Sequence, residues 1–203
     1  MGIYEFAGCV VSYEPLYGLL RRRMETYRSD TEGQPDITLD GTKEDYEKLR
    51  KQYPHLSIEE CEYSCAGAEF YMKLLKHQGF MIHASAVEKE GKAYLFSAPS
   101  GTGKSTHAQL WRQTFKGEPI RIINDDKPAV CLQNGVFYAC GTPFSGKTDK
   151  NENRKAPIQG LCMLHRGKTN KIQKITSGEA LPLILPQTLF YGDEEETNLL
   201  LSF

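Results

Sequence analysis

Long hydrophobic runs and a strong net charge are both missing from this sequence. None of its apolar stretches approaches the roughly 20 residues that a membrane span requires, and its first residues do not resemble a signal peptide. The 25 basic residues nearly balance the 26 acidic ones, and the net charge is −1. Such a balance creates no field that would attract nucleic acid or an anionic membrane. We therefore expect a cytoplasmic protein with no membrane partner and no nucleic-acid partner.

Cysteine patterns that would indicate a metal site or a disulfide framework are also missing. The sequence holds six cysteines, yet none forms a C-x-x-C pair or lies at zinc-finger spacing from a histidine. Cys61 and Cys65, four residues apart on a predicted helix, are expected to be small buried hydrophobes. Reduced thiols are the simplest interpretation.

The composition that remains is that of a globular protein. Hydrophobic residues make up 39% of the 203 residues and charged residues 25%, which suits one domain of ordinary size with a small appended lobe. We expect an N-terminal α+β lobe at residues 1–79, a core at 80–192 and a C-terminal tail at 193–203, acidic and then apolar. Residues 141–157, rich in Gly, Pro, Lys and Asn, are expected to form a mobile loop.

Hydrophobic patterning gives the order of the elements. Strands are predicted at residues 3–12, 36–39, 80–87, 93–98, 120–123, 130–132, 136–138, 160–165 and 171–175. Helices are predicted at 16–27, 42–51, 57–75, after residue 106 and from 176, with capping patterns that begin at Thr42, Ser57 and Thr176. The arginines at 21–23 are expected to form a solvated helix face. Because several strands are joined by short turns such as Asn134-Gly135, the expected fold class is α/β with a mixed, hairpin-rich sheet.

The most specific pattern is a P-loop of the form [A/G]-x-x-x-x-G-K-[S/T] at residues 98–105. A strand precedes it and a helix follows it, which is the context that this motif requires. Small residues let successive backbone N–H groups surround a phosphate, and the helix start adds its positive dipole end. A glycine-rich turn that caps a helix would explain one glycine but not the Gly-Lys-Ser run. The predicted nucleotide-binding residues are Pro99, Ser100, Gly101, Thr102, Gly103, Lys104, Ser105 and Thr106.

Other residues could complete a catalytic site around the P-loop. Lys104 would reach the terminal phosphates, and the Ser105 hydroxyl would bind Mg²⁺. Asp125 and Asp126 directly follow an apolar strand. Adjacent carboxylates repel each other unless they share a cation or a proton, so a metal-binding or proton-accepting role is favoured over an acidic turn.

Two further candidates are weaker on position alone. His83 lies on the strand predicted to form a hairpin with the P-loop strand, although a histidine in a strand is more often a core residue. Lys147 lies in the predicted mobile loop and could offset charge on a transferring phosphoryl group. Arg154 and Lys155 in the same loop could do so too, but a solvated basic loop explains them at least as well.

These motifs, taken in order, resemble the HPr kinase/phosphorylase-like branch of the phosphoenolpyruvate carboxykinase-type P-loop proteins. The resemblance covers about residues 80 to 190 and rests on the segments His83-Ala84-Ser85, 97–107, 124–128, Gly141-Thr142-Pro143, 156–161 and 165–167. It implies a P-loop kinase core in which one aspartate of the pair acts as base on a seryl hydroxyl and the other helps to hold Mg²⁺. It also implies that His83 lies beside the transferred phosphate. Residues 1–79 do not resemble the regulatory domain of the full enzyme, and the sequence ends soon after Pro186 where related proteins continue, so either the copy is shortened or that part is dispensable.

The sequence thus predicts an ATP-dependent kinase that uses Mg²⁺ and transfers the γ-phosphoryl group to a hydroxyl. Serine in a protein or peptide is the expected acceptor, with free serine as an alternative. A hypothesis of another class is a nucleotide-binding scaffold without transfer activity. A GTPase is a weaker third hypothesis, because the guanine-reading N-K-x-D motif is missing. Self-association into a homo-oligomer stays open.

Overall fold

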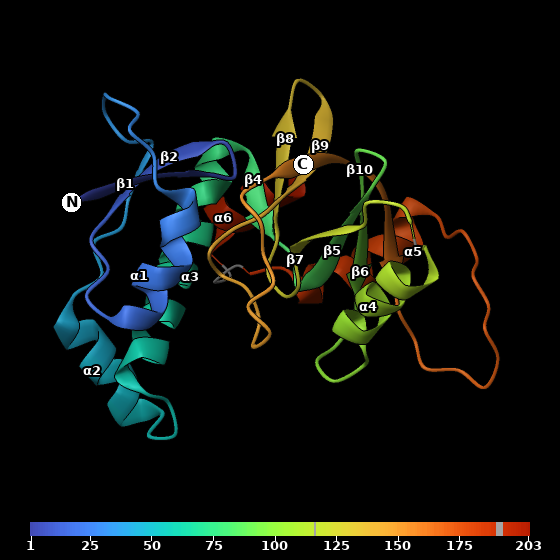
Figure 1. Ribbon diagram of the computed structural model, residues 1–203, viewed down its shortest axis with the longest axis horizontal. Coiled ribbons are helices and arrows are strands. Elements are labelled where there is room, and N and C mark those ends of the chain that lie inside the picture. Colours follow the sequence, from blue (N-terminus) through green and yellow to red (C-terminus); the bar gives the residue numbers. More distant parts are fainter. Residues whose placement is uncertain (116, 190–192) are drawn as a thin grey trace.

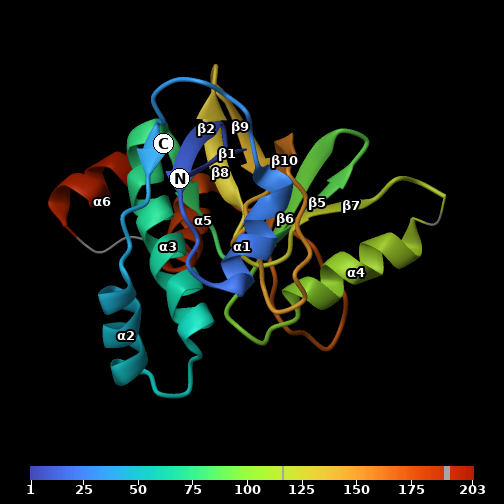
Figure 2. The same cartoon turned by 60° about the vertical axis from the view of Figure 1, so that its left-hand side comes forward.

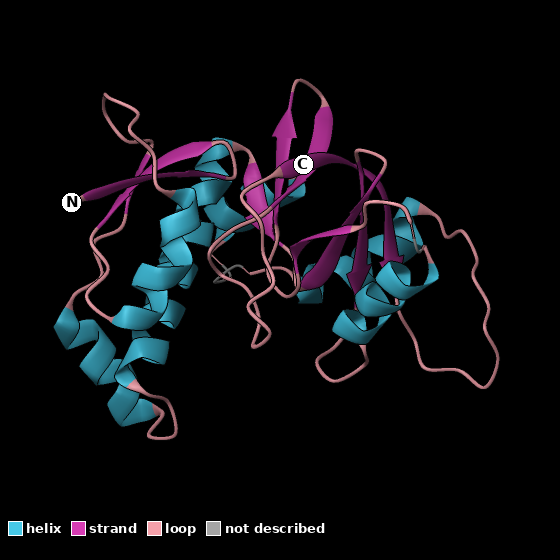
Figure 3. Ribbon diagram, viewed as in Figure 1, coloured by secondary structure: helices cyan, strands magenta, loops and turns pink. Residues whose placement is uncertain are grey.

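A mixed β-sheet forms the centre of the molecule (Figures 1 and 3). The computed structural model describes residues 1–115, 117–189 and 193–203, and within these ranges the sheet has seven strands in the order β4-β8-β9-β10-β6-β5-β7. Their bounds are β4 Gly79–Met81, β5 Ala84–Lys89, β6 Lys92–Ser97, β7 Arg121–Asn124, β8 Ala129–Gln133, β9 Val136–Cys140 and β10 Lys155–Met163. Parallel pairing of β6 with β10 and antiparallel pairing of the other neighbours confirm the predicted α/β class with a mixed sheet.

The predicted hairpins are present. Strands β5 and β6 pair from Ala84↔Ser97 to Lys89↔Lys92, and β8 and β9 pair around the turn at Asn134-Gly135. Both turn residues have positive φ, 51° and 77°, which Asn and Gly tolerate best. The Asn-Gly signal therefore predicted the turn correctly.

The N-terminal residues form a smaller sheet packed beside helices. Strands β1 (Gly2–Phe6), β2 (Cys9–Tyr13) and β3 (Ile37–Thr38) make up this sheet. Helices α1 (Gly18–Met24), α2 (Lys43–Gln52) and α3 (Ile58–Leu74) accompany it, and α3 lies on the opposite side of the molecule from the P-loop helix α4 (Lys104–Thr114; Figures 1 and 2). The capping boxes predicted for α2 and α3 are both formed.

One hydrophobic core joins this N-terminal part to the large sheet. Phe6 from β1, Phe70 from α3 and Phe144 from the loop after β9 are each at most 2% exposed and stack closely, with ring centroids 4.7 Å apart for Phe6 and Phe70 and 5.7 Å for Phe70 and Phe144. Met81 of β4 and Cys131 of β8 belong to the same cluster. Helix α3 is thereby held against the edge of the large sheet. The predicted boundary at residue 79 between an N-terminal lobe and a kinase core stays a prediction. Residues 190–192 of the predicted segment 80–192 lie outside the described ranges.

Four sequence-based assignments were wrong. Residues 3–12 form two strands, because Ala7 and Gly8 turn the chain with φ of 54° and 78°. Residues 80–87 are divided between β4 and β5, since the His83 amide bonds to the carbonyl of Gln187 instead of continuing one ladder. Strand β10 begins at Lys155, so the loop ends at residue 154 and not at 157. Residues 171–175 are irregular; Ile172 is 87% exposed and Ile175 is half-buried, so these residues do not provide the buried face of a strand.

The C-terminal helices are α5 (Ser177–Ile184) and α6 (Glu194–Leu201). The predicted cap at Thr176 accepts a hydrogen bond from the backbone N–H of Glu179 and opens α5. Among the helices that the structure describes, none combines the length and the apolar character that crossing a membrane would need.

Candidate functional site

Three chain segments with polar residues meet at one edge of the large sheet. Strand β6 ends at Ser97, which pairs with Ala84 at the start of β5. Strand β7 is also antiparallel to β5 and ends at Asn124, which pairs with Ala86. The P-loop, His83 and the Asp125-Asp126 pair therefore leave the same edge. The predicted hairpin accounts for the P-loop and His83, whereas the pairing of β7 with β5 was not predicted. The sheet brings together residues that lie far apart in the sequence.

The P-loop occupies residues 98–103, between β6 and α4. Gly101 and Gly103 have φ of 76° and 118°, a region of backbone space in which side chains are strained, and a Cβ at either position would meet no atom within 4 Å. Open space and positive φ at both glycines leave the loop's concave side available for a ligand. Lys104 and Ser105 follow directly, in the first turn of α4. Pro99, Ser100 and Thr106 are exposed, while Thr102 and Ser105 are half-buried.

The side chain of Lys104 lies under the P-loop. Lys104 is 7% exposed, and its Nζ donates a hydrogen bond of 2.9 Å to the carbonyl of Ala98. Burial lowers the pKa of Lys104, and the negative charge of Asp126 acts in the opposite direction. Lys104 and Asp126 are therefore electrostatic neighbours. From outside, Arg166 closes onto the same loop, with Nη2 donating to the carbonyl of Gly101 at 2.6 Å.

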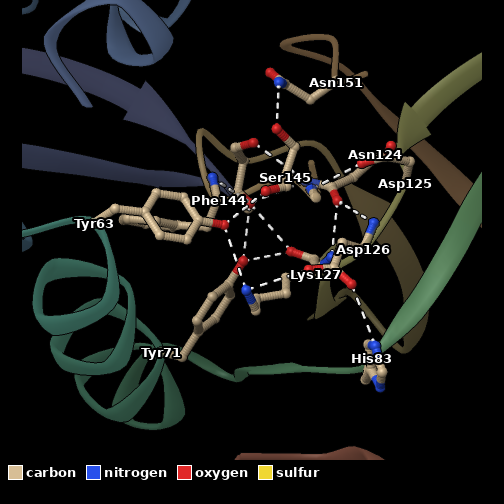
Figure 4. Close-up of polar contacts among 12 residues, drawn as sticks. Tyr63, Tyr71, His83, Asn124, Asp125, Asp126, Lys127, Phe144, Ser145 and Asn151 are labelled. Atoms are coloured by element: carbon tan, nitrogen blue, oxygen red, sulfur yellow. Dashed lines mark hydrogen bonds and ion pairs between the residues drawn. The ribbon is translucent and has the colours of Figure 1, made fainter. Parts of the chain in front are cut away.

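The aspartate pair is positioned by the fully buried side chain of Asn124 (Figure 4). Its Oδ1 accepts hydrogen bonds from the backbone N–H groups of Asp126 at 2.9 Å and Lys127 at 2.8 Å. Its Nδ2 donates to the carbonyl and the hydroxyl of Thr142, both at 3.2 Å. The hydroxyl of Tyr71, on α3, lies 2.8 Å from that of Thr142 and donates to the carbonyl of Lys127. This buried network fixes the turn that presents both carboxylates.

The two carboxylates have opposite electrostatic environments. Asp125 is 3% exposed; burial raises its pKa, although its Oδ1 accepts a 2.9 Å hydrogen bond from the backbone of Gly146. Burial would also raise the pKa of Asp126, but the hydrogen bond from His83 and the charge of Lys127 lower it to about 2. The Lys127 ammonium lies 3.2 Å from Asp126 Oδ2. Asp126 is thus the more readily ionised carboxylate of the pair, and with a side chain 26% exposed it is the more accessible to a ligand.

His83 lies beside Asp126, in the break between β4 and β5. Its Nε2 is 3.2 Å from Asp126 Oδ1 (Figure 4), and its carbonyl accepts a 2.9 Å hydrogen bond from the hydroxyl of Ser97 at the end of β6. The sequence assignment of His83 to the interior of a strand was therefore wrong. The predicted hairpin that brings His83 to the P-loop strand is present, and the contact with Asp126 was not predicted.

The loop at residues 141–154 closes over the aspartates and is held by many contacts. The guanidinium of Arg23, on α1, donates to the carbonyls of Ser145 and Gly146, and its Nε lies 2.9 Å from Asp149 Oδ1. A Cβ on Gly146 would lie 3.0 Å from the Asp126 Cβ and 3.3 Å from Asp125 Oδ1, so only glycine lets the loop approach this closely. Lys147 follows this glycine and is exposed.

Sequence reasoning missed the role of Arg23. Its side chain is only 10% exposed, and its guanidinium lies 4.9 Å from the ring centroid of Tyr63. The expected solvated face therefore holds for the exposed Arg21 and Arg22 but is wrong for Arg23. A run of three arginines carries no signal that distinguishes the buried one. Arg154, also assigned to a solvated loop, forms an ion pair of 2.6 Å with Glu88.

The residues at this edge fit a hydrated Mg²⁺ ion better than a metal held by the protein alone. Ser105, Asp125 and Asp126 offer oxygen atoms, which Mg²⁺ prefers, and Mg²⁺ bound with a nucleotide takes its other ligands from phosphates and water. Among the described residues, no group of three or more His, Cys, Asp and Glu side chains could enclose a metal ion. That donor set agrees with a metal brought by a phosphate ligand.

A large cavity lies between the P-loop helix α4, β6 and β10. It measures about 740 Å³ and is lined by Tyr94, His107 and Trp111 and by residues of β10 and the segment after it. Trp111 lies in a cluster of rings, 4.9 Å from Tyr94 and 5.3 Å from Phe96 between centroids. Cavities of this size and aromatic lining are typical of small-molecule sites.

The function of this chain has to be inferred from the geometry of this site. No family model matches the chain, and no curated protein is significantly similar to it.

Proposed function

We propose that the chain is an ATP-dependent phosphotransferase of the HPr kinase/phosphorylase-like type, which transfers the γ-phosphoryl group to a serine hydroxyl of a peptide or protein. The observation that carries this proposal is that Lys104, under the P-loop after β6, and Asp126, after β7, lie at the same end of the sheet, because both strands end beside the start of β5. A phosphate-binding lysine and a carboxylate at one sheet edge are the parts that phosphoryl transfer needs. The P-loop and its glycine geometry support ATP as the donor.

The proposed nucleotide site extends from the P-loop along α4. The phosphates would lie on the amides of residues 99–105, and Lys104 would leave the carbonyl of Ala98 to bind the terminal phosphate oxygens. The cavity beside Trp111 begins one turn further along α4 and has room for the base and ribose. Ser105 would hold Mg²⁺ together with phosphate oxygens and water, and the ion would supply positive charge that stabilises the phosphates during transfer.

Asp126 is suited to receive the acceptor hydroxyl. Its carboxylate is ionised at neutral pH and can accept the hydroxyl proton as the oxygen bonds to the γ-phosphorus and ADP leaves. His83 and Lys127 hold its two oxygens and so fix its orientation. Because the transition state of phosphoryl transfer is loose, positioning contributes more than the basicity of the carboxylate. Asp125, whose carboxylate is nearly enclosed, positions the loop through Gly146.

The test is calorimetric titration of Mg·ATP together with an assay for γ-phosphate transfer to seryl peptides, a protein pool and free serine. Lys104→Ala should weaken nucleotide binding, and Asp126→Asn should retain binding and lose transfer. Lys92→Ala is a matched control, since Lys92 is exposed at the opposite end of β6. Tight binding without transfer by the wild type would instead indicate a non-catalytic nucleotide-binding module, and absence of binding would refute the proposal.

A further inference from the structure

A second, smaller cavity lies near Asp126, whose neighbour Lys127 forms part of the lining. It measures about 170 Å³ and lies between α3, β4 and the loop that follows β9. Its walls include Tyr63, Gly67, Ala68 and Tyr71 of α3 and the ring of Phe144. Phe144 is fully buried, and Gly67 lets it approach the helix, because a Cβ there would lie 3.0 Å from the ring. The cavity is thus predominantly aromatic and apolar.

Lys127 connects this cavity to the candidate catalytic carboxylate. Its side chain lines the cavity, and its Nζ lies 3.2 Å from Asp126 Oδ2 and 3.4 Å from the hydroxyl of Tyr63 (Figure 4). A single ammonium group therefore touches both Asp126 and the cavity wall. Consecutive Cα atoms of a peptide are about 3.8 Å apart, so a residue next to one whose hydroxyl contacts Asp126 is within reach of the cavity.

The size and lining of the cavity select the chemistry of its occupant. An apolar cavity of about 150 Å³ accommodates a benzene molecule, so this one has room for a side chain of leucine or phenylalanine size. Aromatic walls favour an apolar group, whereas a charged one would lose its hydration there. Free serine has no group that could fill the cavity.

We propose that this cavity binds the apolar side chain of a residue adjacent to the acceptor serine, so that the substrate is a seryl peptide segment and not free serine. The inference rests on the proposed function for its choice of Asp126 as the reacting end. Lys127 then orients Asp126 on one side and borders the specificity cavity on the other. The residues that determine specificity are Tyr63, Ala68, Tyr71 and Phe144.

The experiment compares two amidated, acetylated peptides, Gly-Leu-Ser-Leu-Gly and Gly-Gly-Ser-Gly-Gly. Their binding is measured by calorimetry in the absence of nucleotide, and their phosphorylation is measured separately with Mg·ATP. We expect the leucine peptide to bind about 10-fold or more tightly, because burying one or two leucine side chains is favourable by that margin. In the transfer assay, its kcat/KM should exceed that of the glycine peptide and of free serine by a similar factor.

A variant whose side chain fills the cavity provides the most direct test. Ala68→Leu places a strong helix former at a half-buried position of α3 and occupies the space, so it should abolish the preference for leucine and leave Mg·ATP binding unchanged. Ala180→Leu, the same substitution in α5 outside the cavity, is the control. Ser64→Leu, at the exposed rim of the cavity, is a second variant in case Ala68→Leu perturbs folding.

The binding measurement and the transfer measurement together distinguish failure of this inference from failure of the proposed function. A leucine preference in binding that Ala68→Leu removes supports the cavity assignment, even if no phosphoryl transfer occurs and the kinase proposal fails. Equal binding of both peptides, no binding of either, or transfer that is indifferent to the flanking residues would overturn the cavity assignment and leave the kinase proposal to its own test.

Discussion

His83 and Asp126 are joined by a 3.2 Å contact between Nε2 and Oδ1, although His83 precedes β5 and Asp126 follows β7. The contact forms because β5 lies between β6 and β7, so the residue before β5 meets the residues after β7. With Lys127 on the other oxygen, it holds Asp126 ionised, with its pKa lowered from 3.8 to about 2. Both stability and activity should depend on this carboxylate.

Asp126→Asn should lower the free energy of unfolding at neutral pH by about 2 kcal/mol, because one pKa unit corresponds to about 1.4 kcal/mol. The folded-state pKa lies below that of the unfolded chain. The stabilisation is therefore complete above about pH 4 and is lost as the pH falls through 2. Urea unfolding of the wild type and the variant, with a chelator present, measures this difference. A variant that loses stability between pH 4 and pH 2 as steeply as the wild type would contradict the assignment.

Asp125→Asn should have the opposite effect on stability. Burial raises the pKa of Asp125 above its unfolded value, so the ionised carboxylate destabilises the fold as the pH rises past that value. Asparagine removes the charge, and its Oδ1 can still accept the hydrogen bond from Gly146. We expect a gain of about 1 kcal/mol at pH 7, a smaller gain at pH 3, and lower transfer activity. Thermal unfolding at both pH values tests this, and a loss of stability at pH 7 would show that the charge is stabilising.

The parts of the site that could be predicted from the sequence are those determined by local chemistry. The P-loop needs particular residues at fixed spacing, and the strand and helix around it follow from short patterns that include Lys104. The Asn134-Gly135 hairpin and the caps at Thr42 and Ser57 are likewise local. Each of these features is decided within a few residues, so tertiary packing did not override it.

The missed features depend on contacts between distant segments. Arg23 became a partner of the loop at 141–154 only because α1 packs beside that loop. Tyr71, on α3, completes the hydrogen-bond network of Asn124 and Thr142, although the sequence around Tyr71 is that of an ordinary core residue. The break at His83 arises from the Gln187 carbonyl, which competes with the ladder for the His83 amide. Local sequence patterns do not indicate these contacts, because each contact joins segments that are far apart in the sequence.

Trp111 should report nucleotide binding by a change in its fluorescence. It is the one tryptophan of the sequence and lines the cavity assigned to the base. Mg·ATP should shift or quench its emission in the wild type. In Lys104→Ala the half-maximal nucleotide concentration should rise by about 10- to 100-fold, since charge-assisted hydrogen bonds to the phosphates are lost. Inorganic triphosphate is the control, because it binds the P-loop without a base; an equal fluorescence change with triphosphate would contradict the location of the base.

Arg23→Lys should loosen the loop that covers the aspartates. Lysine keeps the charge but cannot bond Ser145, Gly146 and Asp149 together, so we expect a loss of about 1–3 kcal/mol in stability. Limited digestion with trypsin should cut faster at Lys147 in the variant. Arg22→Lys, at an exposed position of the same helix, is the control. Equal rates of cutting in the wild type and both variants would show that Arg23 does not hold the loop.

Thr142→Val tests whether the hydroxyl of Thr142 holds the buried hydrogen-bond network or whether the side chain only fills space there. The hydroxyl of Thr142 bonds with Tyr71, accepts from Asn124 Nδ2 and from the backbone N–H of Phe144, and all of these groups are enclosed. Valine preserves the shape and leaves these partners without their shared oxygen, which should cost about 1–3 kcal/mol.

Thr142→Ser is the matched control, because it keeps the hydroxyl and loses a methyl group, at a cost of about 1 kcal/mol. Urea unfolding ranks the two variants, and the Trp111 signal shows whether each still binds Mg·ATP. Since Asn124 orients the backbone of Asp126 and Lys127, Thr142→Val should also lower transfer to the seryl peptide while nucleotide affinity is retained. If serine and valine lower stability and transfer equally, the hydroxyl has no positioning role and the turn is held by packing alone.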